Sequence, residues 1–229
     1  MSDVKINNKL KLVIMCIALY LYEIIMGRIW YYNIDKIIGN KNDEQRLILI
    51  ILMGVLMGVL MLLPIIIGAL STNVKDIKEI EISIKNSMRL DKLAHKILLT
   101  ILFSAAVIFI VYTLIGNYSH KSISTNFKIL LFIQALIYAL PEEILFRWFY
   151  QKKLEQIISN KFIATLITGL LFAIIHFFGT DNINSYENII DIIVSIGNRT
   201  TLHFFFNYIK EKSNSIIVPT VVHAIYNYI

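Results

Sequence analysis

The chain has 229 residues, of which 57% are hydrophobic and 17% charged, and its mean hydropathy is +0.67. These values exclude an ordinary soluble globular domain, because such domains carry far more polar surface. The formal net charge of +6 does not indicate nucleic-acid binding, since the Lys and Arg residues lie in short segments between apolar runs, where contact with a cytoplasmic leaflet is favoured.

Seven apolar runs bounded by polar clusters predict membrane-spanning helices, because roughly 20 apolar residues cross a bilayer core. In chain order they are Leu12–Tyr31, Leu47–Leu70, Ile97–Gly116, Ile129–Tyr150, Phe162–Phe178, Ile189–Ile209 and Ser215–Ile229. The connection Ser71–Lys96 has apolar residues near helical spacing and is predicted to lie along the membrane interface. The predicted fold is an all-α, polytopic transmembrane bundle of about seven to eight helices.

Three further features of the sequence refine this prediction. Alternate connections, beginning with the N-terminus, hold 14 Lys and Arg residues against 6 in the opposite set, so the positive-inside rule places the N-terminus in the cytoplasm and predicts a multi-pass cell-membrane protein. Gly54 and Gly58 form a Gly-x-x-x-Gly pair, which is typical of close helix packing. Cys16, the single cysteine, lies in the first run and excludes an intramolecular disulfide.

Ionisable side chains inside the spans indicate function, because each costs at least about 2.5 to 3.5 kcal/mol at mid-membrane unless it has a partner or a task. We predict that they concentrate in the C-terminal half, where they are Glu142, Glu143, Arg147, His176, Arg199, His203 and His223, with Asn227 as a polar companion.

The adjacent acids Glu142 and Glu143 point about 100° apart on a helix, so we expect them to have different environments and roles. Glu143 and Arg147 stand four residues apart, the spacing of a helical ion pair, and we assign them to structure. Glu142 then suits a general base for water. Pro141 frees a backbone carbonyl and favours a small hydrated break beside the acids. The alternative is that both acids merely mark the cytoplasmic end of a span.

Histidines follow in the later spans. His176 ends the fifth run, with Phe172 on the same helix face, and is either an interface residue or a catalytic one. His223 and Asn227 stand four residues apart and present an imidazole and an amide N–H, the donors that an oxyanion hole requires. They are otherwise explained as hydrogen-bonding links between helices.

A second His-x-x-x-Asn pair, His203 and Asn207, has the same spacing, and Ser195 and Arg199 extend its stripe backward. Spacing alone does not choose between the two pairs. We expect this stripe to face the bundle interior, where it lines substrate access or stabilises the site.

The ordered motifs Glu-Glu-x-x-x-Arg, Phe-x-x-x-His and His-x-x-x-Asn, at residues 142–147, 172–176 and 223–227, resemble those of the CPBP family of CAAX proteases and bacteriocin-processing enzymes, also called the Abi family. The likeness begins near Phe127. It suggests a division into N-terminal transmembrane helices, residues 1–126, and a catalytic core, residues 127–229.

The resemblance implies an intramembrane endopeptidase. Glu142 and His176 would activate water, and His223 and Asn227 would stabilise the oxyanion. Glu143 and Arg147 would brace the site. The implied substrates are membrane-associated peptides, either prenylated and CAAX-like, or bacteriocins and pheromones.

The cofactor and the function each have an alternative. No cofactor is expected, because the resemblance and the missing His-Glu-x-x-His motif favour metal-free water activation; alternatively Glu142, His176 and His223 would hold zinc. The functional alternative is a non-proteolytic bacteriocin-immunity or binding protein. A proton-coupled transporter using Glu142 and His203 is disfavoured because no inverted repeat is visible.

Overall fold

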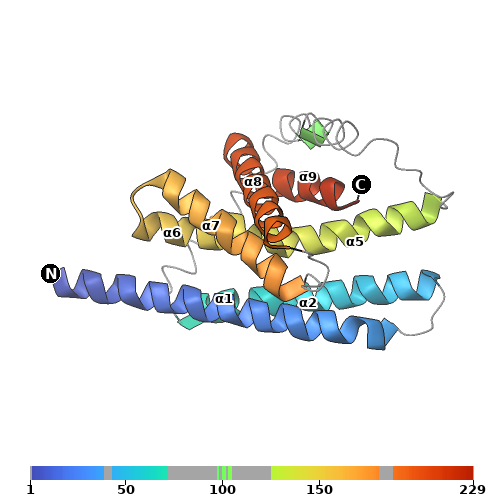
Figure 1. Cartoon of the computed structure of the whole chain (residues 1–229), viewed down its shortest axis with the longest axis horizontal. Coiled ribbons are helices and arrows are strands. Elements are labelled where there is room, and N and C mark those ends of the chain that lie inside the picture. Colours follow the sequence, from blue (N-terminus) through green and yellow to red (C-terminus); the bar gives the residue numbers. More distant parts are fainter. Residues whose placement is uncertain are drawn as a thin grey trace. The chain divides into compact units, whose positions relative to one another are not determined.

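The computed structural model describes residues 2–38, 43–71, 97, 100–101, 103–104, 125–180 and 188–228. Within those ranges the chain forms helices and no strand, which confirms the all-α fold class. The predicted interfacial connection Ser71–Lys96 and nearly all of the predicted span Ile97–Gly116 lie outside the described residues, so the count of seven to eight helices stays a prediction. The described helices are α1 (Ser2–Ile38), α2 (Asp43–Ser71), α5 (Thr125–Glu143), the π-helix η1 (Ile144–Tyr150), α6 (Gln151–Ile157), α7 (Lys161–Ile175), the π-helix η2 (His176–Thr180), α8 (Ile189–Ser213) and α9 (Ile217–Tyr228) (Figure 1).

The helices form two compact units, each of which combines distant parts of the chain. The first unit contains Met1–Gly39 and Phe146–Phe205, and the second contains Asn40–Leu145 and Phe206–Ile229. Helices pack by the apolar faces they share rather than by sequence order. The predicted division between residues 126 and 127, which follows position along the chain, stays a prediction.

In the first unit, α1 packs against α7 and η2, and α6 packs against α7. The Tyr20 hydroxyl donates to the Leu171 carbonyl oxygen over 2.8 Å, which ties α1 to α7. The Gln151 amide of α6 donates to the Thr165 hydroxyl of α7 over 2.9 Å. These bonds matter in an apolar setting, because a buried polar group without a partner is costly there.

In the second unit, α5 packs against α2 on one side and α9 on another. The α5–α9 contact is built on small residues, Ala135, Ala139 and Ala224, flanked by Phe132 and Leu136. Small side chains let helix backbones approach closely, where dispersion and polar contacts drive association in lipid.

The predicted packing role of Gly54 and Gly58 on α2 is confirmed. A Cβ built on Gly54 would lie 3.0 Å from Cζ of Tyr138, and one built on Gly58 would lie 2.7 Å from Cγ of Pro141. The glycine pair therefore lies directly against α5 near its acidic end.

Helix ends agree with local capping signals. The Asn160 side chain accepts from the Ile163 N–H at the start of α7, and Asn188 accepts from Ile190 and Asp191 at the start of α8. Asn214, with a φ of 46°, ends α8, since asparagine tolerates this left-handed conformation better than most residues. The predicted span Ile129–Tyr150 extends in both directions as three helical segments, α5, η1 and α6.

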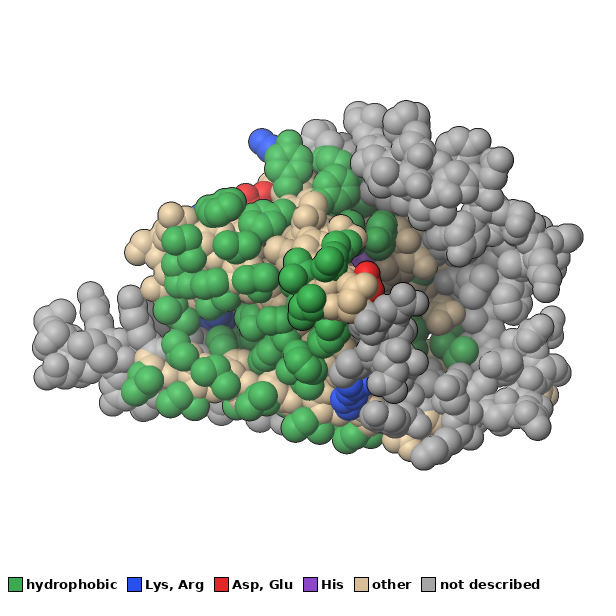
Figure 2. Space-filling view, viewed as in Figure 1, with side chains coloured by type: hydrophobic (Ala, Val, Ile, Leu, Met, Phe, Trp, Pro, Cys, Tyr) green, Lys and Arg blue, Asp and Glu red, His purple; other side chains and the backbone are tan. Residues whose placement is uncertain are grey.

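Two helical segments of the described chain are long and apolar enough to cross a membrane, Lys161–Phe178 and Ile189–Ser213, and Ile48–Leu63 is a shorter apolar stretch. Large apolar side chains are exposed on α1, α2 and α8, and Figure 2 shows hydrophobic side chains over much of the described face. An extensive exposed apolar surface is typical of contact with lipid rather than with water.

Candidate active site

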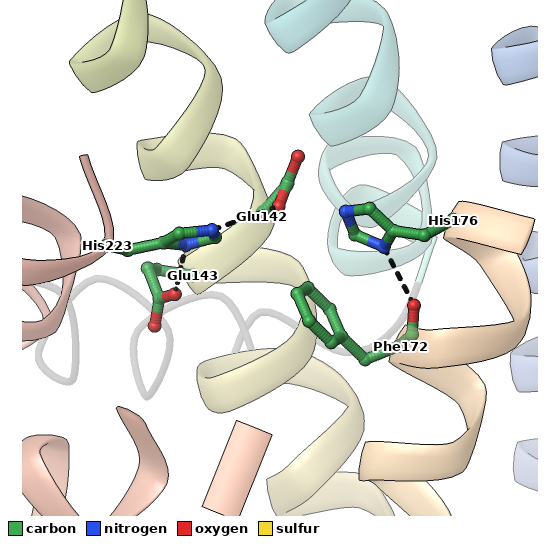
Figure 3. A network of polar contacts seen from close by, with 5 residues as sticks. All are labelled: Glu142, Glu143, Phe172, His176 and His223. Carbon is green, nitrogen blue, oxygen red and sulfur yellow. Dashed lines mark hydrogen bonds and ion pairs between the residues drawn. The ribbon is translucent and has the colours of Figure 1, made fainter. Parts of the chain in front are cut away.

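The C-terminal turn of α5 and the helix α9 bring two carboxylates and one imidazole together in the second unit. Glu143 Oε1 lies 2.8 Å from Nδ1 of His223, and Glu142 Oε2 lies 3.8 Å from Nε2 of the same ring. Figure 3 shows the His223 ring between the two acids. Two adjacent acids, Glu142 and Glu143, therefore form one cluster with His223, which lies 80 positions after Glu143 in the sequence.

The contact with Glu143 defines what the His223 ring can do. A carboxylate oxygen accepts, so in the hydrogen bond to an ionised Glu143 the proton lies on Nδ1 of His223. This bond fixes the ring orientation and aims Nε2 toward Glu142. A separation of 3.8 Å is within ion-pair range but too long for a hydrogen bond. Glu142 and Nε2 thus face each other across a short gap.

Glu142 and Glu143 share one partner that the 100° between their directions did not predict, because both reach His223. The reason is that an imidazole has two nitrogens on opposite sides of its ring, so one ring placed between the two directions contacts both acids. Their exposure nevertheless differs: the Glu142 side chain retains 18% of its accessible surface, whereas that of Glu143 has none. Only Glu142 keeps the access that a base for water needs.

One face of the His223 ring is covered by an aromatic ring that was not predicted from the sequence. Phe206 stacks on His223 with ring centroids 4.7 Å apart and an interplanar angle of 26°. Phe206 also contacts Tyr226 edge-on. Nothing in the sequence singles out Phe206, since it is one of three consecutive phenylalanines. Asn227 lies one turn beyond His223 on α9 and is exposed.

In the first unit, Phe172 contacts both the other predicted catalytic histidine, His176, and Arg147. The His176 ring lies 4.4 Å from the Phe172 ring, which confirms that the two share a helix face. The Arg147 guanidinium lies 4.3 Å from the centre of the Phe172 ring. Nδ1 of His176 donates to the Phe172 carbonyl oxygen over 2.8 Å (Figure 3). The proton is therefore on Nδ1, and the neutral ring presents its lone pair at Nε2.

The two predicted supporting residues thus contact different partners. Glu143 holds His223 directly, and Arg147 packs on the ring that holds His176. The ion pair predicted between Glu143 and Arg147 stays a prediction. Arg147 is fully buried, and a cation–π contact is a favourable setting for a buried guanidinium.

Both groups of predicted site residues lie where the backbone leaves α-helical geometry. The π-helix η1 begins directly after Glu143, and η2 begins at His176. Short π-helical segments are rare and occur frequently at functional sites. Pro141 gives a partial signal for the first of them, and the sequence carries no comparable signal for the second.

The second His-x-x-x-Asn pair is buried, as predicted: His203 has no exposed surface and Asn207 retains 5%. A Cβ built on Gly169 of α7 would lie 3.3 Å from Cδ2 of His203, so this histidine packs closely against a helix backbone. Arg199 donates to Ser195 one turn earlier in the same stripe. These contacts are those of helix packing.

Across the described residues, no three His, Cys, Asp or Glu side chains are arranged as a group that could hold a metal ion. The zinc alternative and the metal-free expectation both remain predictions.

Comparison with known proteins assigns the segment that carries these residues. No curated protein and no solved structure matches the chain. Residues 124–229, which include all six predicted site residues, match the family model described as type II CAAX prenyl endopeptidase, Rce1-like. This confirms the resemblance to the CAAX proteases. Residues 124–229, a little under half of the chain, are therefore similar to the Rce1-like type II CAAX prenyl endopeptidases, a family of membrane-embedded proteases.

Proposed function

We propose that this protein is an intramembrane endopeptidase that hydrolyses a membrane-associated peptide by glutamate-activated water. The observation that carries the proposal is the placement of His223 between Glu142 and Glu143, within the segment that matches a protease family. A carboxylate with partial access beside an oriented imidazole is the arrangement that water-activating sites require.

In the proposed reaction, Glu142 and His176 take a proton from water, and the resulting hydroxide attacks the carbonyl carbon of the scissile peptide bond. The carbonyl oxygen becomes an oxyanion that accepts from Nε2–H of His223 and from the Asn227 amide. The tetrahedral intermediate collapses by breaking the C–N bond, and the abstracted proton passes to the leaving amine. The products are a carboxylate and a protonated amine, because the carboxylic acid formed on cleavage gives its proton to the amine.

The donor role of His223 imposes a condition on its protons. Nε2 must carry hydrogen to stabilise the oxyanion, whereas Nδ1 faces Glu143. Either the ring is an imidazolium between two carboxylates, or Glu143 is a carboxylic acid that donates to Nδ1. In both cases Glu143 sets the protonation of Nε2 through Nδ1, in the way that a buried carboxylate sets the tautomer of a catalytic histidine.

The substrate proposal follows the family. We propose prenylated peptides that end in a CAAX-like sequence, with bacteriocin or pheromone precursors as the other membrane-associated class. The apolar exterior of the described helices supports a substrate that arrives through the bilayer rather than through water. The lipid bilayer and a lipidated or membrane-bound peptide are the proposed partners, and nucleic acid is not.

The test is hydrolysis of a farnesylated CAAX peptide by the full chain in nanodiscs, read by mass spectrometry of both products. Glu142→Gln removes the base with little change in shape and is expected to lower kcat at least about 10²-fold. Glu211→Gln, on an exposed part of α8, is the matched control and should keep full activity. Full activity in Glu142→Gln would remove the proposed mechanism.

The same variants separate the enzyme from a binding protein. If protection of cells from a bacteriocin persists in Glu142→Gln and His176→Ala, that protection rests on binding alone. Loss of protection together with loss of cleavage supports proteolysis.

We also propose a multi-pass protein of the cell membrane with its N-terminus in the cytoplasm, on the distribution of Lys and Arg between spans. In a Cys16→Ser background, Ser159→Cys, in the turn between α6 and α7, is expected to react with an impermeant maleimide only from the cytoplasmic side. Asn33→Cys, near the end of α1, should react only from the opposite side. The reverse pattern would invert the topology.

A further inference from the structure

One ionisable residue inside the first apolar run takes no part in the mechanism above. Glu23 is the single Asp, Glu, Lys, Arg or His between Lys11 and Arg28, and it is 2% exposed. It follows Cys16 and Tyr20 at steps of four and three, and Gly27 follows it, so these four residues share one face of α1. The outward face of the same helix carries exposed leucines and isoleucines, which are Leu10, Ile14, Ile17, Leu21, Ile25 and Ile29.

That inward face lies against two other helices of the first unit. The Tyr20 hydroxyl donates to the Leu171 carbonyl oxygen in α7, and the Tyr20 ring contacts the Tyr150 ring edge-on with centroids 6.3 Å apart. Tyr150 is 1% exposed. Because Glu23 follows Tyr20 by three residues on the same face of α1, Glu23 and Tyr150 both lie in the interior next to Tyr20.

Both residues place polar atoms in this interior without a hydrogen-bond partner among the described residues. These atoms are the two carboxyl oxygens of Glu23 and the hydroxyl of Tyr150. A buried polar atom of this kind costs about 1 to 3 kcal/mol, and a buried carboxylate costs more. The carboxyl oxygens need donors and the phenol needs an acceptor. A water molecule provides both kinds of group, and buried waters typically make about three such bonds.

We propose that Glu23 and Tyr150 form a buried water-binding site in the first unit. The site joins a carboxyl group on α1 to a phenol at the end of η1, through water that donates to Glu23 and accepts from Tyr150. It is separate from the Glu142–Glu143–His223 cluster, which belongs to the second unit.

The position of this site suits it to supply water for hydrolysis, a role that rests on the proposed peptidase function. α1 packs against η2, the segment that begins at His176, and Leu171, which holds Tyr20, directly precedes Phe172. A peptidase inside a bilayer needs a supply of water next to its base. Water held by Glu23 and Tyr150 would reach the segment that carries His176 without crossing lipid.

The binding of water is tested without any activity assay, by X-ray radiolytic footprinting of the full chain in nanodiscs. Hydroxyl radicals formed from bound water modify side chains that touch it, even when they are buried. Tyr150 is expected to be oxidised several-fold faster than Phe206, which is equally buried at 1% but packs on His223 and other rings. Equal and slow oxidation of Tyr150 and Phe206 would overturn the proposal.

Two variants assign the water to Glu23. Glu23→Leu removes the carboxyl group and should reduce Tyr150 oxidation to the level of Phe206, whereas Glu23→Gln keeps a hydrogen-bonding head group and should retain it. Unchanged oxidation in Glu23→Leu would exclude Glu23 from the site. If Glu23→Leu does not fold, the wild-type comparison and Glu23→Gln still decide, because loss of labelling in a folded Glu23→Gln would also contradict the proposal.

The kinetic arm separates this inference from the proposed function. Glu23→Leu should lower kcat for the CAAX peptide with KM unchanged, and Glu23→Gln should restore most of it. Labelled Tyr150 in a protein without peptidase activity would keep the water site and reject the proposed function. Active protein with unlabelled Tyr150 would do the reverse.

Discussion

Gly58 of α2 lies directly against Pro141 of α5: a Cβ built on the glycine would come within 2.7 Å of the proline Cγ and 4.0 Å of the Ile137 carbonyl oxygen. Pro141 has no N–H to donate to the Ile137 carbonyl oxygen. Gly58 has no side chain, so the α2 backbone comes close to this part of α5. The residue after Pro141 is Glu142, the proposed base. The packing contact between α2 and α5 is therefore made by the residue next to the proposed base.

We expect Gly58→Ala to push α5 away from α2 and to shift the acidic turn. Overpacking of this kind typically costs about 1 to 3 kcal/mol, so the variant should melt at a lower temperature in detergent. Its peptidase activity should fall by more than the loss of folded protein explains. Gly197→Ala is the matched control, because nothing lies within 4 Å of a Cβ built at that position. A Gly58→Ala protein with unchanged melting temperature and activity would show that this contact is not needed.

Glu143 is expected to act through His223 rather than on substrate. Removing it in Glu143→Ala leaves Nδ1 of a buried histidine without this partner, at a cost of about 1 to 3 kcal/mol. Because Nε2 then loses its orientation and its proton control, kcat should fall by about 10²-fold or more, with KM little changed.

The measurement for this variant is steady-state kinetics across pH. A structural residue would lower the active fraction without altering the shape of the pH profile, whereas a residue that controls the protonation of His223 should shift the limb that reports it. An unaltered profile in a folded Glu143→Ala protein would contradict the assigned role.

Phe172 is expected to matter because it contacts both Arg147 and His176. Phe172→Leu keeps an apolar side chain of similar volume but removes the ring that the guanidinium faces, at a cost of about 1 to 2 kcal/mol for a desolvated contact. We expect lower stability together with reduced kcat, since the His176 ring loses its neighbour.

The control for Phe172→Leu is the same substitution in the same helix, Phe162→Leu, at a residue that is 66% exposed. Both variants should insert into the membrane and purify alike. Differential scanning fluorimetry should then show a lower melting temperature for Phe172→Leu than for Phe162→Leu, and the activity assay a lower kcat. Equal behaviour of the two would place Phe172 outside the site.

Metal dependence has a direct measurement. We expect the purified protein to keep its activity after dialysis against EDTA and after treatment with 1,10-phenanthroline, with less than one equivalent of zinc by elemental analysis. A protein that loses activity to the chelator and regains it with added Zn²⁺ would establish the zinc alternative, in which Glu142, His176 and His223 are the expected ligands.

The sequence by itself predicted that the helices lie in lipid, and it identified the side chains that could carry out the chemistry. Long apolar runs predict helices in lipid because only a helix satisfies its own backbone there. The described helices cover the expected runs apart from Ile97–Gly116, most of which lies outside the described residues. The rarity of charge in such runs directed attention to Glu142, His176 and His223, and three ordered motifs indicated the resemblance to the CAAX proteases that the match over residues 124–229 confirms.

The tertiary structure decided which groups touch. Helical periodicity relates Glu142 to Glu143 but not either of them to His223, 80 residues away, so the shared imidazole was not predictable. Phe206 and Glu23 carry no motif, and only packing shows that Phe206 stacks on His223 and that Glu23 is buried in the unit that also buries Tyr150. The physical reason is that spacing along a helix fixes the direction of a side chain, whereas its partner is chosen by the helices that pack against it.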